Sequence, residues 1–325
     1  MGYNVTSGAA PVEWDVLWTH EYSLMKDHYM SAIREAKANQ IVNHVAGSGF
    51  YTSKVWLATS QSLKGIPKSF KLPKQKKELL MYADQHPHIT WILKDNSHRN
   101  IQVMELKDMN LDKENSFVQK FVNNPLLIDN RKFDIGVYTV ITSIRPLRIY
   151  VYEGDSLIRF CAEDYVPFDS TRLNKYVVGD DYTPIWEIPS LKRLFTEQKL
   201  GWRASIDAYL RLNGMNSKEI WTQIHHIIVE VFRNQQPKML TAAKSISSKA
   251  KFFELSRFDF IVDEQLNVFL MEVSPRGQSD YSEGQKRRMT FSDAEPSQDF
   301  IVPDSEIYVP LKECVQGLCS ICDEL

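Results

Sequence analysis

The sequence lacks several features that would assign a class of protein directly. Its 325 residues include only four cysteines, and the formal net charge is only −2. We find no apolar run of about 20 residues, the length that a membrane-spanning helix needs. The N-terminal residues show no basic stretch followed by an apolar run, so we expect no signal peptide. There is also no internal repeat and no long segment of low complexity.

These absences narrow the function. Few cysteines in a long chain fit a protein of a reducing compartment. Cys319 and Cys322 have the CxxC spacing of some zinc sites. No second such pair or neighbouring pair of histidines completes a ligand set, however, and an amphipathic C-terminal helix accounts for them better. The near-neutral charge gives no indication of nucleic-acid binding, so an acidic partner would have to meet a local basic patch.

What the sequence contains is a mixed order of helices and strand pairs. Hairpins separated by helices, without a regular βαβ alternation, predict an α+β fold with antiparallel sheets and flanking helices. Hairpins are expected at 89–94 with 101–106, 148–154 with 156–163, and 252–261 with 267–273. Further strands are expected at 68–73, 116–122 and 133–143, and helices at 74–87, 216–234, 237–247 and about 305–322.

The last of these hairpins carries carboxylates inside apolar strands. Counting outwards from its turn puts Asp259 opposite Glu272, and directly opposed residues share a face of a sheet. Ser274 returns to that face two residues later. Two close carboxylates repel each other, and a hard divalent cation such as Mg²⁺ would relieve the repulsion. The alternative is a solvated sheet edge, or pairing with Arg257 and Arg276.

Other charged residues lie at the ends or on one face of apolar strands. Lys94 ends the strand expected at 89–94 and enters a polar loop, where a lysine either binds phosphates or is merely solvated. Lys132 and Asp134 share one face of a strand, because side chains two residues apart point the same way. Arg159 can lie on a neighbouring strand.

The segments around these residues resemble a known family. WILKDNSHRNI, RKFDIGVYTVITS, LIRFCAEDY and FFELSRFDFIVDEQLNVFLMEVS are similar, in this order, to segments of the tubulin tyrosine ligase-like proteins. The resemblance covers roughly residues 41 to 276. It implies an ATP-grasp-like fold that holds a nucleotide between two lobes. The expected regions are an N-terminal region at 1–73, a central lobe at 74–125, a C-terminal lobe with the metal site at 126–305 and a C-terminal helix at 306–325.

The resemblance also implies an activity. Members of the family use ATP and Mg²⁺ to join an amino acid to a protein carboxylate through an acyl phosphate. The expected function is therefore ligation of an amino acid, glutamate first, to the tails of tubulin or of another acidic protein. The expected location is the cytoplasm, with association to microtubules of the cytoskeleton or cilium. No nucleic acid and no transmembrane segment are expected.

The family's functional residues can be carried over where the motifs match. Lys94 resembles the lysine that reaches the nucleotide phosphates, and the segment Gln119, Lys120, Phe121 and Val122 resembles the hinge that meets the adenine. The remaining positions resemble catalytic residues near the phosphates and the amino acid (Lys132, Asp134 and Arg159) and metal ligands (Asp259, Glu272 and Ser274).

Several positions depart from the family's pattern. Ser274 stands where the family has an asparagine, and Gly136 stands where it has an arginine that meets the γ-phosphate. Asp180 and Asp181 replace a threonine and an asparagine. The loss of a phosphate contact can cost orders of magnitude in rate. The alternative to a working ligase is therefore a divergent pseudoenzyme that binds a nucleotide or tubulin.

Overall fold

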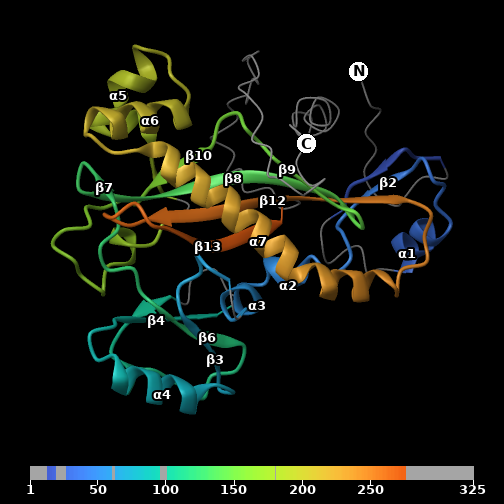
Figure 1. Cartoon of the computed structure of the whole chain (residues 1–325), viewed down its shortest axis with the longest axis horizontal. Coiled ribbons are helices and arrows are strands. Elements are labelled where there is room, and N and C mark those ends of the chain that lie inside the picture. The colour runs from blue at the N-terminus through green and yellow to red at the C-terminus, as the bar shows by residue number, and fades with distance from the viewer. Residues whose placement is uncertain (1–12, 20–26, 61–62, 96–100, 180, 276–325) are drawn as a thin grey trace.

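Two β-sheets with flanking helices make up the fold (Figure 1). The computed structural model of the chain describes residues 13–19, 27–60, 63–95, 101–179 and 181–275. The helix expected at about 305–322, with its cysteines, lies outside the described residues.

The larger sheet has nine strands, of which six follow the order β1-β2-β12-β8-β10-β11. In addition, β13 pairs with β12, and both β7 and β9 pair with β8. Most pairs are antiparallel as expected, but β2 pairs with both β1 and β12 in parallel, so the sheet is mixed. The strands are β1 (Val16–Leu17), β2 (Ile41–Asn43), β7 (Leu127–Ile128), β8 (Arg131–Ile144), β9 (Leu147–Val151), β10 (Leu157–Phe160), β11 (Thr183–Pro184), β12 (Lys251–Val262) and β13 (Val268–Pro275).

The centre of this sheet is β8. β12 pairs along one edge of it from Ile135 to Ile141, while β9 and β10 follow one another along the other edge. The expected hairpin between 148–154 and 156–163 is therefore wrong. β9 folds straight back on β8, and β10 pairs with the earlier half of β8. Both fit along one edge because β8 is long.

The smaller sheet has four strands in the order β3-β6-β4-β5. It confirms the strand expected at 68–73 and the hairpin of 89–94 with 101–106. The helix α4 (Lys76–Gln85), expected at 74–87, is packed against this sheet through Leu79, which joins Phe70 and Trp91 in a separate core. The strands are β3 (Ser69–Leu72), β4 (Trp91–Asp95), β5 (Gln102–Val103) and β6 (Ser116–Lys120).

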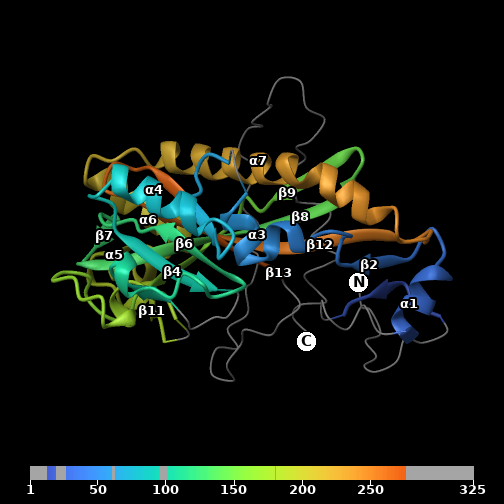
Figure 2. The same ribbon diagram turned by 90° about the horizontal axis from the view of Figure 1, so that it is seen from below.

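The long helix α7 (Ser217–Ala243) crosses one face of the larger sheet, as Figures 1 and 2 show. Ile224, Ile228 and Phe232 are fully buried on it at helical spacing. The two helices expected at 216–234 and 237–247 are in fact this single helix, with Pro237 inside it. A proline inside a helix costs about 3 kcal/mol. Burial of Met239 beyond it in the core offsets that cost.

The remaining helices are short. α3 (Lys54–Ala58) contacts both β6 and β13, so it joins the two sheets. None of the helices in the described ranges is both long and apolar enough to cross a lipid bilayer. The other helices are α1 (Asp27–Arg34), α2 (Gly49–Thr52), α5 (Pro189–Thr196) and α6 (Trp202–Leu212).

Candidate functional site

The face of the larger sheet that points away from α7 is polar at its centre. Phe258 packs on Phe232 of α7, with ring centroids 5.6 Å apart, and Ile135 belongs to the same core. Because side chains alternate along a strand, the residues next to Phe258 and Ile135 point to the opposite face. These residues are Asp134 and Gly136 of β8, and Arg257 and Asp259 of β12.

The first ion pair on this face joins β8 and β10. Asp134 and Arg159 are directly opposed in the antiparallel pairing. Nε and Nη2 of Arg159 donate to the two carboxylate oxygens of Asp134 at 3.0 and 2.7 Å. This two-point geometry fixes the guanidinium plane. Burial, together with the neighbouring Asp259, raises the pKa of Asp134 to about 6, although Arg159 opposes the rise.

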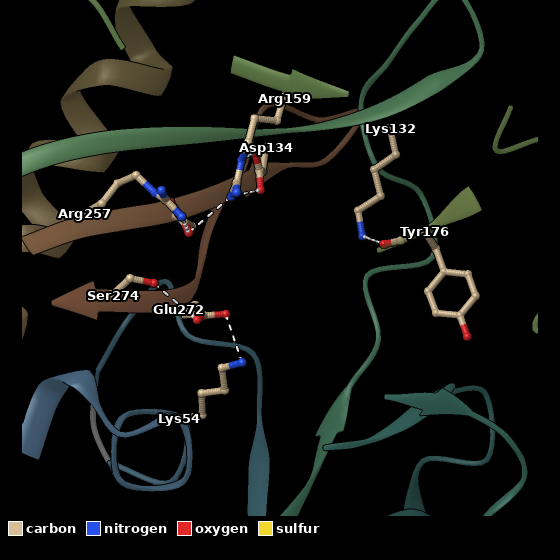
Figure 3. A network of polar contacts seen from close by, with 9 residues as sticks. Lys54, Lys132, Asp134, Arg159, Tyr176, Arg257, Glu272 and Ser274 are labelled. Carbon is tan, nitrogen blue, oxygen red and sulfur yellow. Dashed lines mark hydrogen bonds and ion pairs between the residues drawn. The ribbon is translucent and has the colours of Figure 1, made fainter. Parts of the chain in front are cut away.

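The second ion pair lies within β12. Nε and Nη2 of Arg257 donate to Asp259 at 2.6 and 2.8 Å, and Arg159 donates to the same carboxylate at 3.3 Å. Figure 3 shows the two guanidinium groups converging from β12 and β10. Arg257 and Asp259 are 6% and 8% exposed as side chains, so their charges are largely shielded from solvent.

Gly136 makes room for this second pair. It lies opposite Asp259 in the register of β8 and β12. A Cβ atom at Gly136 would lie 2.8 Å from Cδ of Arg257 and 3.2 Å from Oδ1 of Asp259. The stem of Arg257 therefore fills the space that a side chain at position 136 would take.

The third carboxylate, Glu272, is opposite Asp259 in the hairpin of β12 and β13, as expected. Ser274 Oγ donates to it at 3.2 Å, and Lys54 of α3 forms an ion pair with it at 3.3 Å (Figure 3). Glu272 is 28% exposed as a side chain, more than Asp259. Solvent and a ligand can therefore reach Glu272 more readily.

Two further lysines approach the cluster. Lys132 Nζ donates to the carbonyl of Tyr176 at 2.7 Å, as drawn in Figure 3. Lys94, from β4 of the smaller sheet, donates to Gln119 Oε1 at 2.9 Å. Burial and, to a smaller extent, the neighbouring Lys132 lower the pKa of Lys94 to about 7, although Glu272 opposes this change. These couplings bring Lys94 into the same electrostatic cluster as residues of the larger sheet.

The segment expected to act as a hinge, Gln119 to Val122, begins with the last two residues of β6 and continues beyond it. The backbone N–H groups of Lys120 and Phe121 donate to the carbonyls of Lys68 and Thr90, both at 2.8 Å. Gln119 is buried, Lys120 is exposed, and the Phe121 ring lies 5.7 Å from Nζ of Lys132. The segment therefore begins inside the smaller sheet and ends beside the larger one.

The cluster has a surplus of positive charge. Its five cations are Lys54, Lys94, Lys132, Arg159 and Arg257, and its three carboxylates are Asp134, Asp259 and Glu272. Burial lowers the pKa of both Lys94 and Lys132, so part of this surplus is lost at neutral pH. Partly buried positive charge of this kind favours an anionic ligand.

The structure brings together seven of the residues singled out from the sequence. They are Lys94, Lys132, Asp134, Arg159, Asp259, Glu272 and Ser274. Sequence reasoning assigned no role to Lys54 and named Arg257 only as a possible partner of the carboxylates, which is the pairing that the structure shows for Asp259. Lys54 is a charged residue in an otherwise apolar short helix, which is a weak signal. Asp180 lies outside the described residues.

Whether these residues could hold Mg²⁺ depends on their donor atoms. Glu272 and Ser274 present oxygen atoms, which suit a hard cation. Both oxygens of Asp259 already accept from guanidinium groups. Among the residues that the structure describes, no group of three or more His, Cys, Asp and Glu side chains is placed to hold a metal alone. The donor set fits Mg²⁺ bound mainly through Glu272, Ser274 and ligand oxygens.

Comparisons with known proteins identify the family of the chain. The model of the Tubulin-tyrosine ligase family matches residues 26–280. The chain is similar to "Probable tubulin polyglutamylase ttll-15" of Caenorhabditis elegans, with 51% identity over 337 residues, 96% of this chain and 66% of that protein. It is also 29% identical over 287 residues to "Tubulin monoglutamylase TTLL4" of Mus musculus, covering 81% of this chain and 23% of that protein.

A human relative extends the set. "Tubulin polyglutamylase TTLL6" of Homo sapiens is 26% identical over 289 residues, covering 84% of this chain and 32% of that protein. The chain thus spans about two thirds of the nematode protein and a quarter to a third of the two mammalian proteins. It belongs to the tubulin-tyrosine ligase family.

Proposed function

We propose that the chain is an ATP- and Mg²⁺-dependent ligase that joins an amino acid, glutamate first, to a carboxylate of a protein. One observation carries the proposal: five cations from both sheets and α3 surround three carboxylates on the face opposite α7. A triphosphate meets this surplus of charge better than any neutral ligand. The family and the names of the relatives support the same conclusion.

The nucleotide would lie between the two sheets in an ATP-grasp-like arrangement. Lys94 of the smaller sheet would contact the phosphates, as a compact charge at the end of a strand can. The adenine would lie against the segment from Gln119 to Val122. The N–H groups of Lys120 and Phe121 already donate to other backbone carbonyls. The carbonyl oxygens of this segment and the backbone of Val122 would therefore supply its hydrogen bonds to the adenine.

Mg²⁺ would be held by Glu272 and Ser274 together with phosphate oxygens. When bound, it neutralises charge on the phosphates and so favours attack at the terminal phosphorus. Lys54 now pairs with Glu272. Its ammonium would then turn from Glu272 toward a phosphate oxygen or the acceptor.

The reaction would have two steps. An oxygen of the acceptor carboxylate attacks the γ-phosphorus and ADP leaves, which gives an acyl phosphate. The amine of the incoming amino acid then attacks the acyl carbon, phosphate leaves, an amide bond forms and the amine loses its proton. Lys132 and Arg159 would orient the anionic groups, and Asp134 holds Arg159 in a fixed plane.

Tubulin tails are the acceptor that the relatives' names indicate, and they are acidic. Another acidic protein would meet the same charges. A protein acting on tubulin would work in the cytoplasm and at microtubules of the cytoskeleton or cilium. The only basis for this proposed location is the substrate of the family.

Release of ADP by the purified chain tests the proposal. Reactions would contain Mg²⁺, ATP, purified tubulin, and glutamate, glycine or tyrosine in separate samples. We expect ADP release that requires both tubulin and glutamate, and tails whose mass rises by one or more glutamate residues. The matched control replaces tubulin with tubulin whose tails have been removed by protease.

A second outcome has a specific structural basis. Gly136 and Ser274 depart from the family's pattern, and the carboxylate of Asp259 already accepts hydrogen bonds from Arg257. Binding of ATP without any ADP release under all acceptor conditions would identify a pseudoenzyme that keeps a nucleotide site. No binding of ATP at all would exclude the ligase.

A further inference from the structure

The space next to Gly136 singles out Arg257. A Cβ at position 136 would lie 2.8 Å from Cδ and 3.3 Å from Cγ of Arg257. Real Cβ atoms avoid contacts this short, so the two positions cannot both carry full side chains in the present arrangement. Only one of them can direct a guanidinium into the cluster.

Arg257 reaches the cluster from a different strand. It starts opposite Tyr138 of β8, whereas Asp259 lies opposite Gly136. Its stem passes over Gly136, and its guanidinium ends on Asp259, beside Arg159. The guanidinium of Arg257 therefore lies on the polar face, next to Gly136.

We propose that Arg257 supplies the guanidinium that contacts the transferred phosphate, in the place of a side chain at position 136. The proposal rests on the proposed function. Asp259 uses Nε and Nη2 of Arg257, two groups of a fork that carries five N–H donors, and so orients the remainder. In this arrangement the main role of Asp259 is to orient Arg257, and direct coordination of a metal is secondary.

The charge count supports this role. Asp134 and Asp259 are matched by Arg159 and Arg257, so the lysines provide the surplus that draws an anion in. Two guanidinium groups fixed side by side by carboxylates are suited to two-point contact with phosphate oxygens. A lysine lacks the planar fork and would not keep this geometry.

The test exchanges the two positions and uses inorganic tripolyphosphate and ATP as probes. The variants are Gly136→Arg, Arg257→Lys, Arg257→Gly and the double exchange G136R/R257G, each checked for its unliganded melting temperature. Arg148→Ala is the matched control, because it removes an exposed guanidinium from the neighbouring strand β9. Affinities for tripolyphosphate, ATP and adenosine are measured by calorimetry.

We expect Arg257→Lys and Arg257→Gly to lose at least tenfold in affinity for tripolyphosphate and ATP, with adenosine unchanged. Gly136→Arg should also lose affinity and melt earlier, because its side chain collides with Arg257. The double exchange should recover affinity to within a few-fold of the unmodified chain, and Arg148→Ala should match that chain. Recovery by a second substitution is not expected of a purely structural arginine.

Two results would overturn the inference: unchanged tripolyphosphate affinity in both Arg257 variants, or a double exchange no better than Gly136→Arg alone. A third result separates this inference from the proposed function. If the unmodified chain binds tripolyphosphate but not ATP, and the Arg257 variants lose tripolyphosphate binding, the proposed ligase is excluded and Arg257 remains an anion contact. A chain that binds neither probe would exclude both.

Discussion

At the scale of single residues, Lys94 has a pKa close to neutral pH. Burial lowers its pKa to about 7, and a bound phosphate would raise it again. Above pH 7 the free amine is mostly neutral, so ATP binding must take up a proton. We expect ATP affinity to fall as pH rises from 7 to 9, by up to about tenfold per pH unit.

Calorimetry in buffers of different ionisation enthalpy would show this proton uptake directly. Lys94→Ala should weaken ATP binding more than adenosine binding and should remove the pH dependence between 7 and 9. A pH dependence that survives in Lys94→Ala would assign the titration to another group. Equal losses for ATP and adenosine would show that Lys94 supports the fold and not the phosphates.

Glu272 is the carboxylate best placed for a metal. Glu272→Gln keeps the size of the side chain and its contact with Ser274 but removes the charge. We expect the gain in ATP affinity that Mg²⁺ provides to be lost, so that affinity in the presence of Mg²⁺ falls at least about tenfold. The reason is that one charged oxygen ligand of the metal becomes neutral. Titration of ATP with and without Mg²⁺ measures this, and Glu197→Gln, on an exposed ion pair, is the control. Unchanged Mg²⁺ dependence would contradict the metal role.

The sequence predicted the residues of the polar face, and it offered pairing with Arg257 only as the alternative to a metal. The opposition of Asp259 and Glu272 follows from counting in one hairpin, and the structure confirms it. The ion pair of Arg257 with Asp259 confirms that alternative for this carboxylate. Counting within the hairpin could not decide for it, because the pair depends on the missing side chain of Gly136 on another strand. Lys54 was missed for a similar reason, since only the packing of α3 brings it near Glu272.

At the scale of elements, Gly65 controls how α7 packs near β13. Its φ is +81°, a Cβ there would lie 2.6 Å from Cγ1 of Ile227, and its carbonyl accepts from the Leu270 N–H at 2.7 Å. We expect Gly65→Ala to lower the free energy of unfolding by roughly 3 kcal/mol, from backbone strain and the clash together.

Gly214→Ala is the matched control for that variant. Its φ is +74°, but nothing lies within 4 Å of its Cβ position. Urea unfolding of both variants should therefore give a smaller loss for Gly214→Ala, about 1 kcal/mol from strain alone. Equal losses would mean that Ile227 moves aside without cost.

Element boundaries show where sequence patterns reach their limit. Local signals, such as the short strand that ends before Pro73 and the helix that begins after it, were confirmed. The pairing of β9 and β10 with β8 was not predicted, because it depends on the length of β8 and not on the turn between β9 and β10. The continuity of α7 through Pro237 likewise follows from the buried residues on both sides of it.

At the scale of the whole molecule, the site depends on two cores at once. Leu79 is fully buried in the core of the smaller sheet, and Leu191 in that of the larger one. Replacement of either by alanine should cost about 3 kcal/mol. We expect only Leu79→Ala to weaken ATP binding by the folded protein as well, because Lys94 and the segment from Gln119 to Val122 stand on its sheet.

Calorimetric titration at a temperature where both variants are folded separates the two effects. Melting curves give the loss of stability, and the affinity of the folded fraction gives the effect on the site. An equal loss of affinity in both variants would show that the smaller sheet does not contribute separately to binding.

The position of β12 has a consequence for synthesis of the chain. It lies between β2 and β8, although roughly a hundred residues separate it from the end of β8. At ribosomal rates of roughly 5–20 residues per second, the edge of β8 that pairs with β12 remains unpaired for on the order of 10 s. During that interval the nascent protein presents an open β-edge, the kind of surface that chaperones cover and that self-associates when they do not.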